Sequence, residues 1–447
     1  MAPTYERPAA PIPNALPGAG MGPPGTAGSA SAADLAWSSF VRDPNLRTVI
    51  NHALAQNRTV RQAIANVVAA RAQYRVQRAA QLPSIDASLG VTASSQFFGL
   101  PGQPTVSATY YQASAGLSAW EIDLFGRLKS LSDAKLQQYL ATAETARAAR
   151  VTLIAETATA YLTLAADRSR LAVAQETMAS GKRTMDLTEQ LVGGGTSNRT
   201  DFYQAETIYQ QARADVAALT TAIAQDHDAL DLLAGGPVDD SLLPPALPDQ
   251  LDWFTDVPVG MSSAVLLGRP DVLAAEHQLI AANANIGAAR AAFFPQLELT
   301  ATGGIASAAL AALFTGPAFI YTLAPSLIVP LFHGGANIAN LDAAWAQKAA
   351  LVAAYELAIQ TSFREVADAL ALRATIQEQL AAQTALVDAS QKAFELAQAR
   401  YKAGVDTFLT TLVAERSLYT AKDSFLATQL AALANRVELY RALGGGA

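Results

Sequence analysis

The chain has 447 residues, of which 51% are hydrophobic and only 15% are charged, and its formal net charge is −7. The charged fraction lies below the roughly 25% typical of soluble domains, and the acidic balance without a dense Lys/Arg run excludes a nucleic-acid-binding footprint. Because no cysteine is present, disulfides, thiolate metal sites and Cys nucleophiles are excluded as well.

The first segment, residues 1–33, is rich in Pro, Gly and Ala and lacks the basic-then-apolar pattern of a signal peptide. Such a composition cannot bury a core of its own, so we expect an extended N-terminal arm. The GAGMG run at residues 18–22 has no predicted strand before it and no helix after it, which argues against a phosphate loop.

Residues 34–236 predict a helix, two strands and a long helical hairpin. Apolar and polar residues alternate on both sides of a Gly/Pro-rich loop, which predicts a β-hairpin over about 84–125. From residue 127 onward, good helix formers dominate and Pro is absent until Pro237. We therefore expect a helical hairpin over about 127–234 with its turn at Gly193, Gly194 and Gly195.

A linker over residues 237–260 precedes a second unit, residues 261–447, with the same predicted order. Here the β-hairpin is expected over about 296–332 and the helical hairpin over about 336–443, with its tip at Lys402 and Gly404. A helix of roughly 65 residues spans about 100 Å. Ser197 and Asp406 follow the two turns at matching positions and are expected to be the N-caps of the returning helices.

The two units are an internal two-fold sequence repeat. RAAQLPSIDASLG, which begins at Arg78, resembles RAAFFPQLELTATG, which begins at Arg290, and Glu156 and Gly195 match Glu365 and Gly404 without a gap. A seven-residue spacing of apolar side chains along the second long helix also predicts coiled-coil packing. A fibrous coiled-coil protein is an alternative, although it does not explain the paired hairpins.

The strands predict a sheet with one apolar and one water-facing side. Ile85 and Leu89 alternate with Asp86 in the first hairpin, and Leu297 alternates with Glu298 in the second. Membrane β-barrels need about eight strands or more, and open edges are not tolerated in lipid. We therefore expect several copies of the chain to share one barrel, with the Asp86 and Glu298 carboxylates facing the lumen.

A membrane helix is the alternative for residues 299–332, because this stretch has no formally charged side chain and is long enough to span a bilayer. Pro317, Pro325 and Pro330 interrupt the stretch, however, and the corresponding part of the first unit is less apolar.

Six motifs along the chain carry a resemblance to a known family. They are PTYERP (3–8), WEIDLFGR (120–127), GRPDVLAAEHQL (268–279), IGAARAAFFPQL (286–297), RYKAGVDTFLTTLVAERSLYTA (400–421) and LYRALGGG (439–446). With these motifs, the chain resembles the TolC-like outer membrane factor family over nearly its whole length, in the lipoprotein branch that serves RND-type drug-efflux pumps.

The resemblance implies an α+β membrane protein that forms a homotrimer. Its 12-stranded outer-membrane β-barrel, with four strands per chain, would continue into a 12-helix periplasmic α-barrel. It further implies a passive exit duct of a tripartite efflux pump in a Gram-negative outer membrane, which carries small molecules and drugs. The expected partners are outer-membrane lipid, a periplasmic adaptor and a proton-driven inner-membrane pump.

The resemblance also assigns roles to residues of the two turns. Gly193, Gly194, Gly195, Lys402 and Gly404 would face the adaptor.

The periplasmic gate would consist of Leu409 and Val413, which lie four residues apart and share a helical face, together with Asp406. Packing of Leu409 and Val413 as core between helices is the alternative.

Two departures from the family pattern concern an anchor and the gate. Members of this branch usually begin with an acylated Cys shortly before the Pro-x-Tyr motif, whereas Met1 lies near that place here, so a lipid anchor stays an open expectation. Many relatives carry Asp where this chain has Val413.

Few features of the sequence indicate a catalytic, cofactor or metal site. The four His residues are scattered, and no Gly-x-Ser-x-Gly elbow or phosphate loop is present, so we expect neither an enzyme nor a cofactor or metal site. Type I protein secretion and metal-ion efflux are the alternative functions for such a channel, because the sequence does not identify the cargo.

Overall fold

The computed structural model describes residues 1–17, 35–96, 106–257, 262–315 and 319–446. Parts of the predicted arm, of the linker and of both β-hairpin loops lie outside these ranges. The chain divides into two compact units. The first comprises Met1–Ala9, Ala65–Ala143 and Ala274–Glu356, and the second comprises Ala10–Ile64, Glu144–Leu273 and Leu357–Ala447. Each unit thus takes residues from both halves of the sequence.

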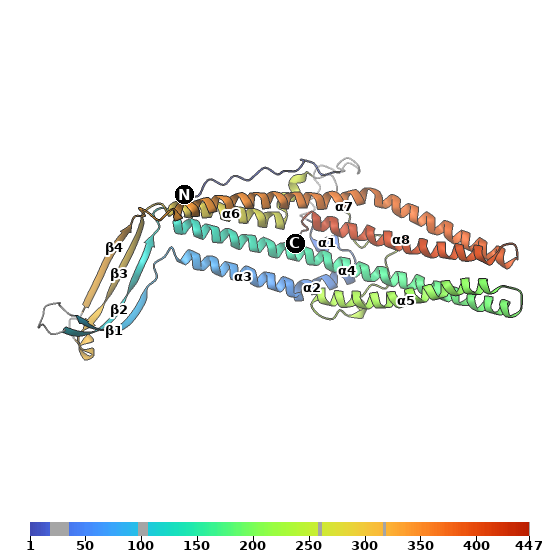
Figure 1. Ribbon diagram of the computed structural model, residues 1–447, viewed down its shortest axis with the longest axis horizontal. Helices are drawn as coiled ribbons and strands as arrows, with labels where there is room; N and C mark the ends of the chain where they lie inside the picture. Colours follow the sequence, from blue (N-terminus) through green and yellow to red (C-terminus); the bar gives the residue numbers. More distant parts are fainter. Residues whose placement is uncertain (18–34, 97–105, 258–261, 316–318, 447) are drawn as a thin grey trace. The chain divides into compact units, whose positions relative to one another are not determined.

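The first unit contains a four-stranded antiparallel sheet (Figure 1). Its strands are β1 (Asp86–Gln96), β2 (Val106–Ile122), β3 (Gln296–Ser307) and β4 (Phe319–Ile328). The strands pair in sequence order, so β2 and β3 join the two hairpins into one sheet. Within the described chain, β1 and β4 are therefore edge strands, each with one row of backbone groups outside the ladder.

The register gives the sheet two chemically different faces. Asp86 lies opposite Gly116, and Gly116 lies opposite Thr302. Because Thr302 and Glu298 are an even number of residues apart on β3, Asp86 and Glu298 share a face. The other polar residues of that face include Ser88, Thr92, Gln112, Ser114, Thr300, Thr322 and Ser326. The opposite face carries Leu89, Val91, Leu297, Leu299, Leu323 and Leu327.

A β-bulge in β2 interrupts the alternation that the sequence predicts. The register shifts between Leu117 and Trp120, and Ala119 adopts a φ of 49° while its N–H donates to Thr300 Oγ1 at 3.0 Å. An extra residue on one strand reverses the facing of the residues that follow it. Trp120 therefore lies opposite Leu299, on the apolar face, and Glu121 lies opposite Glu298, on the polar face.

The membrane-helix alternative for residues 299–332 is wrong in the described part of this stretch, which forms β3, the short 3₁₀ helix η4 (Leu310–Leu313) and β4. In the part of the chain that the structure describes, no helix combines the length and apolar character needed to cross a membrane.

The N-terminal residues of the first unit pack on α6 (Pro270–Ala291). Arg7 donates two hydrogen bonds of 2.7 Å to the carboxylate of Glu276, and Tyr5 donates a third of 3.1 Å. A Cβ atom at Gly287 would lie 2.6 Å from the Ala2 nitrogen, so only glycine admits the arm at this position. The start of the arm is thus extended but fixed to the helix.

Long helices extend from the strands. They are α4 (Arg127–Gly193), α5 (Arg199–Ala234), α7 (Ala336–Lys402) and α8 (Phe408–Ala442), and α4 and α7 each have 67 residues. In the second unit, α4 pairs with α5 and α7 pairs with α8 as antiparallel hairpins (Figure 1). The remaining helices are α1 (Trp37–Phe40), α2 (Pro44–Gln56), α3 (Arg58–Ala79), η2 (Asp240–Leu242) and η3 (Ser263–Gly268).

The core of the second unit forms where α2, the two hairpins and the segment after α5 meet. Phe40 stacks between Phe254 and Tyr440, with ring centroids at 5.2 and 4.2 Å. The Tyr161 hydroxyl, on a buried side chain of α4, donates to the carbonyl of Leu242 at 3.0 Å. The core therefore buries aromatic rings and also gives the buried Tyr161 hydroxyl a hydrogen-bond partner, as a dense interior requires.

A cluster of charges lies beside this core. Arg269, whose side chain is only 5% exposed, donates 3.0 and 2.7 Å hydrogen bonds to Asp271 and one of 2.9 Å to Glu365. It also donates to the carbonyl of Ala442 at 2.6 Å, and Arg441 lies 3.4 Å from Glu365. Burial alone would raise the pKa of Asp271, but the hydrogen bonds and charge of Arg269 outweigh burial and lower it.

Arg269→Met should destabilise the fold by about 2 kcal/mol, because it removes the buried guanidinium that donates to Asp271, to Glu365 and to the carbonyl of Ala442. Lys182→Met is the matched control. Its side chain is 55% exposed and pairs with Asp186 on the same helix, so the loss should stay within about 0.5 kcal/mol. Guanidinium unfolding followed by circular dichroism measures both, and equal midpoints for the two variants would contradict the role assigned to Arg269.

Candidate gate and pore-facing residues

The turns of the two helical hairpins have the same backbone geometry. Gly195 and Gly404 adopt φ values of 74° and 71°, which glycine reaches without a steric cost. In the first turn, the N–H of Thr196 donates to the carbonyl of Leu191 at 2.9 Å, and Val405 donates equivalently in the second turn. Both helices thus end in the bonding pattern of a Schellman motif.

The predicted N-caps are wrong by one residue at both returning helices. Asn198, rather than Ser197, caps α5 by accepting from the N–H of Asp201, and Ser197 instead donates its hydroxyl to the Asp201 carboxylate. The N-cap of α8 is Thr407, which makes no side-chain cap hydrogen bond.

Asp406 accepts a 2.6 Å hydrogen bond from the guanidinium of Arg400 instead of capping α8. An available cation outcompetes the backbone N–H groups for this carboxylate, because a charge-assisted bond is the stronger one. The same contact raises the pKa of Arg400.

A small apolar cluster holds the two hairpins together near the turns. Ile208 of α5 packs with Phe408 and Leu412 of α8, and the rings of Tyr401 and Phe408 lie 5.3 Å apart. Burial, and secondarily the carboxylate of Asp201, raise the pKa of Tyr401. The face of α8 that carries Phe408 and Leu412 is thus occupied by contacts within the chain.

Leu409 and Val413 lie outside that packing. They are 51% and 56% exposed, whereas Phe408 and Leu412 beside them are buried. Two apolar side chains four residues apart on one helical face form a stripe. Within a single chain, Leu409 and Val413 are therefore not core residues. The alternative, that they pack as core between helices, does not hold for the contacts within one copy.

The residues predicted to face an adaptor lie at the turns and are exposed. They are Gly193, Gly194, Gly195, Lys402 and Gly404. Val405, between them and α8, is 64% exposed and adds an apolar side chain to the second turn.

The predicted pore carboxylates occupy the polar face of the sheet. Asp86 is exposed and Glu298 is half-buried. Glu298 lies directly opposite Glu121, where like charges would repel. The guanidinium of Arg127 forms a two-point ion pair with Glu121, so Glu298 contributes the unpaired charge of this row. Sequence reasoning did not identify Glu121, because the bulge changes its face.

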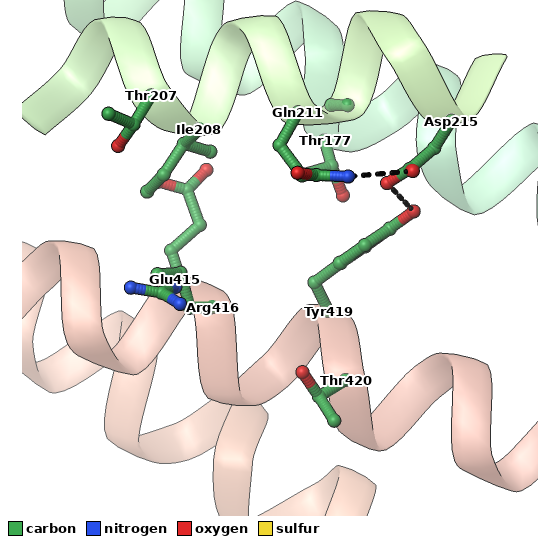
Figure 2. Close-up of a pocket in the computed structure, with 10 residues that line it drawn as sticks. Thr177, Thr207, Ile208, Gln211, Asp215, Glu415, Arg416, Tyr419 and Thr420 are labelled. Carbon is green, nitrogen blue, oxygen red and sulfur yellow. Dashed lines mark hydrogen bonds between the residues drawn. The ribbon is translucent and has the colours of Figure 1, made fainter. Parts of the chain in front are cut away.

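Sequence reasoning also missed a polar site between α4, α5 and α8 (Figure 2). Asp215 of α5 accepts from the Tyr419 hydroxyl at 2.8 Å and from Gln211 at 2.9 Å. The Glu415 carboxyl is buried among these helices. The sequence signal that could have identified Glu415 was its spacing, because Glu415 continues the buried series of Phe408, Leu412 and Leu418 on α8. In the described ranges, no group of three or more metal-ligating side chains is present.

Comparison with known proteins gives consistent matches. The model of the outer membrane efflux protein family matches residues 49–236 and again 261–445. Outer membrane protein OprJ of Pseudomonas aeruginosa is 42% identical over 447 residues, which cover 100% of this chain and 92% of OprJ. The toluene efflux pump outer membrane protein TtgI of Pseudomonas putida is 43% identical over 448 residues, covering 99% and 94%.

The fold also matches a solved structure. The open state of the MtrE outer membrane channel of Neisseria gonorrhoeae superposes with a TM-score of 0.87 at 36% identity, covering 100% of this chain and 98% of that one. The family match spans both halves of the chain, and the relatives agree with it in fold and sequence. The chain therefore belongs to the outer membrane efflux protein family and is an efflux channel protein of the Gram-negative outer membrane.

Proposed function

We propose that three copies of the chain form one closed channel, which serves as the passive exit duct of a tripartite efflux pump. The observation that carries this proposal is the open four-stranded sheet with one apolar and one polar face. Lipid does not tolerate unpaired strand edges, and three such sheets supply the twelve strands of a closed barrel. The apolar face with Leu89 and Leu323, which are 76% and 66% exposed, then meets lipid.

The long helices support the periplasmic part of the proposal. The two helical hairpins of each copy give four helices, and twelve helices from three copies build a periplasmic α-barrel. The repeated order of helix, strands and hairpin makes each half of the chain one segment of both barrels. A periplasmic adaptor contacts the exposed turns around Gly195 and Gly404, and a proton-driven inner-membrane pump supplies the energy.

The cargo is proposed to be small organic molecules. The printed name of TtgI describes toluene efflux, and this relative aligns with nearly the whole chain. The duct itself needs no cofactor, because transport down its lumen is passive and the pump does the work.

The exposed stripe of Leu409 and Val413 is the proposed gate. In a trimer, each residue forms a ring of three apolar side chains, and a narrow apolar constriction closes a pore by dewetting. Phe408 and Leu412 pack inward, whereas this stripe lies on a neighbouring, exposed face of α8. The ion pair of Asp406 with Arg400 stiffens the turn that precedes it.

Assembly is tested first. Chemical crosslinking of the detergent-purified protein should stop at three copies, and planar-bilayer recording should show discrete channels, because only closure removes the strand edges. A stable monomer without conductance would contradict the trimeric duct.

The carboxylates of the polar face are tested through selectivity. Asp86→Asn combined with Glu298→Gln should reduce the preference for cations in reversal-potential measurements, because two rings of three negative charges are lost from the lumen. Glu189→Gln is the control, since it removes an exposed carboxylate of α4 remote in sequence from the strands. Unchanged selectivity of the double variant would show that these carboxylates do not line the narrow part of the pore.

Leu409→Ala combined with Val413→Ser should raise the single-channel conductance of a correctly assembled trimer, because smaller and more polar side chains stay wetted. Closure of the parent channel should also respond little to pH and divalent cations, since neither ring titrates, whereas Val413→Asp should introduce both responses. The gate assignment fails if the double variant assembles normally and conducts no better than the parent.

A further inference from the structure

A cavity of about 460 Å³ lies in the groove between α4, α5 and α8 (Figure 2). Its wall includes Thr177 of α4, Ile208, Ala212 and Asp215 of α5, and Glu415 and Tyr419 of α8. The exposed residues Thr207 and Thr420 also line it, so the cavity is reached from solvent. Its volume exceeds that of one water molecule many times over.

The Glu415 carboxyl is the unusual group of this cavity. The residue is only 6% exposed, and its Oε1 atom accepts no hydrogen bond. Burial raises the pKa of Glu415, while the Ser180 hydroxyl and the Arg183 charge act in the opposite direction without cancelling it. A buried carboxylate oxygen without a donor is costly, so a donor that enters the cavity gains a strong partner.

The second carboxylate of the wall is already satisfied. Both oxygens of Asp215 accept hydrogen bonds, one from Tyr419 of α8 and one from Gln211 of α5 (Figure 2). Asp215 therefore joins α5 to α8 and shapes the wall, and the free acceptor of the site is Glu415.

The other charged side chain of the lining is Arg416 of α8, which is exposed. It follows Glu415 directly in sequence, and successive helical residues do not face each other. The wall thus offers one free carboxylate oxygen, hydroxyl oxygens such as that of Thr177, and an apolar surface from Ile208 and Ala212. Hard metal cations require about six oxygen ligands, more than one free carboxylate oxygen and neighbouring hydroxyls readily supply.

We propose that this cavity binds a small primary ammonium ion, whose N–H groups donate to Glu415 Oε1 and to the Thr177 hydroxyl while its short alkyl chain packs on Ile208 and Ala212. The Thr177 hydroxyl donates to the carbonyl of Val173 at 2.9 Å, which leaves its lone pairs free to accept. The bound ion neutralises the buried carboxylate and links α8 to the α4–α5 hairpin. This site shares no residue with the proposed gate or with the pore carboxylates.

Thermal unfolding of the detergent-purified full chain tests the site with n-propylammonium chloride as the probe. Tetramethylammonium chloride at the same ionic strength is the control ion, because it carries charge but no N–H donor. Saturating propylammonium should raise the unfolding midpoint of the parent by about 2 °C relative to tetramethylammonium. Equal midpoints with the two ions would overturn the proposal.

Two variants locate the effect. Glu415→Gln keeps the shape of the side chain and removes its charge, so the response to propylammonium should disappear. Glu189→Gln removes an exposed carboxylate of α4 and should keep the full response. A response that survives Glu415→Gln would assign the binding to another place and reject this site.

If Glu415→Gln does not fold, the pH dependence of the response of the parent chain provides an independent test. Protonation of a carboxyl removes its attraction for an ammonium ion, so the response at about pH 8 should be lost at about pH 4. A response of the same size at both pH values would contradict pairing with Glu415. Neither arm measures conductance or oligomeric state, so failure here is distinguishable from failure of the proposed duct.

Discussion

The rows of backbone N–H and C=O groups at the outer edges of β1 and β4 are the constraint on which the rest of the structure depends. The described chain supplies no further strand to pair with them, and a bilayer supplies no water. A sheet that is apolar on one face and polar on the other can meet this constraint in lipid only by closing with other copies. The proposed trimer, its lumen and its gate all follow from that closure.

The bulge in β2 shows how one residue adjusts such a sheet. Without it, Trp120 would share a face with Asp86, and Glu121 would lie on the apolar side. The extra residue at Ala119 places the indole opposite Leu299 and the carboxylate beside Arg127. In the proposed barrel, with lipid on one side of the sheet and water on the other, the bulge keeps Glu121 off the lipid face, where a charge is expensive.

Two buried charged groups of the helical part, Arg269 and Glu415, differ in their hydrogen bonding. Arg269 is buried, but carboxylates and a carbonyl take up its donors, so the cluster stabilises the fold only as a complete set. Glu415 is buried with one oxygen unsatisfied, which leaves the groove between α8 and the α4–α5 hairpin with an unused acceptor. The Arg269 cluster joins segments of the chain by hydrogen bonds, whereas the groove at Glu415 is the proposed ligand site.

The sequence by itself determined the order of strands and long helices, the turns at Gly195 and Gly404 and the two-faced character of the sheet, because Pro, Gly and side-chain periodicity act locally. Tertiary structure alone decided the N-caps, the face of Glu121 and the partners of Asp406. Each depends on a competing contact, such as Arg400 for Asp406, that no local pattern encodes. The burial of Glu415 and the exposure of Leu409 and Val413 were likewise decided by how α8 packs on its neighbours, since the helix pattern permits either face to turn inward.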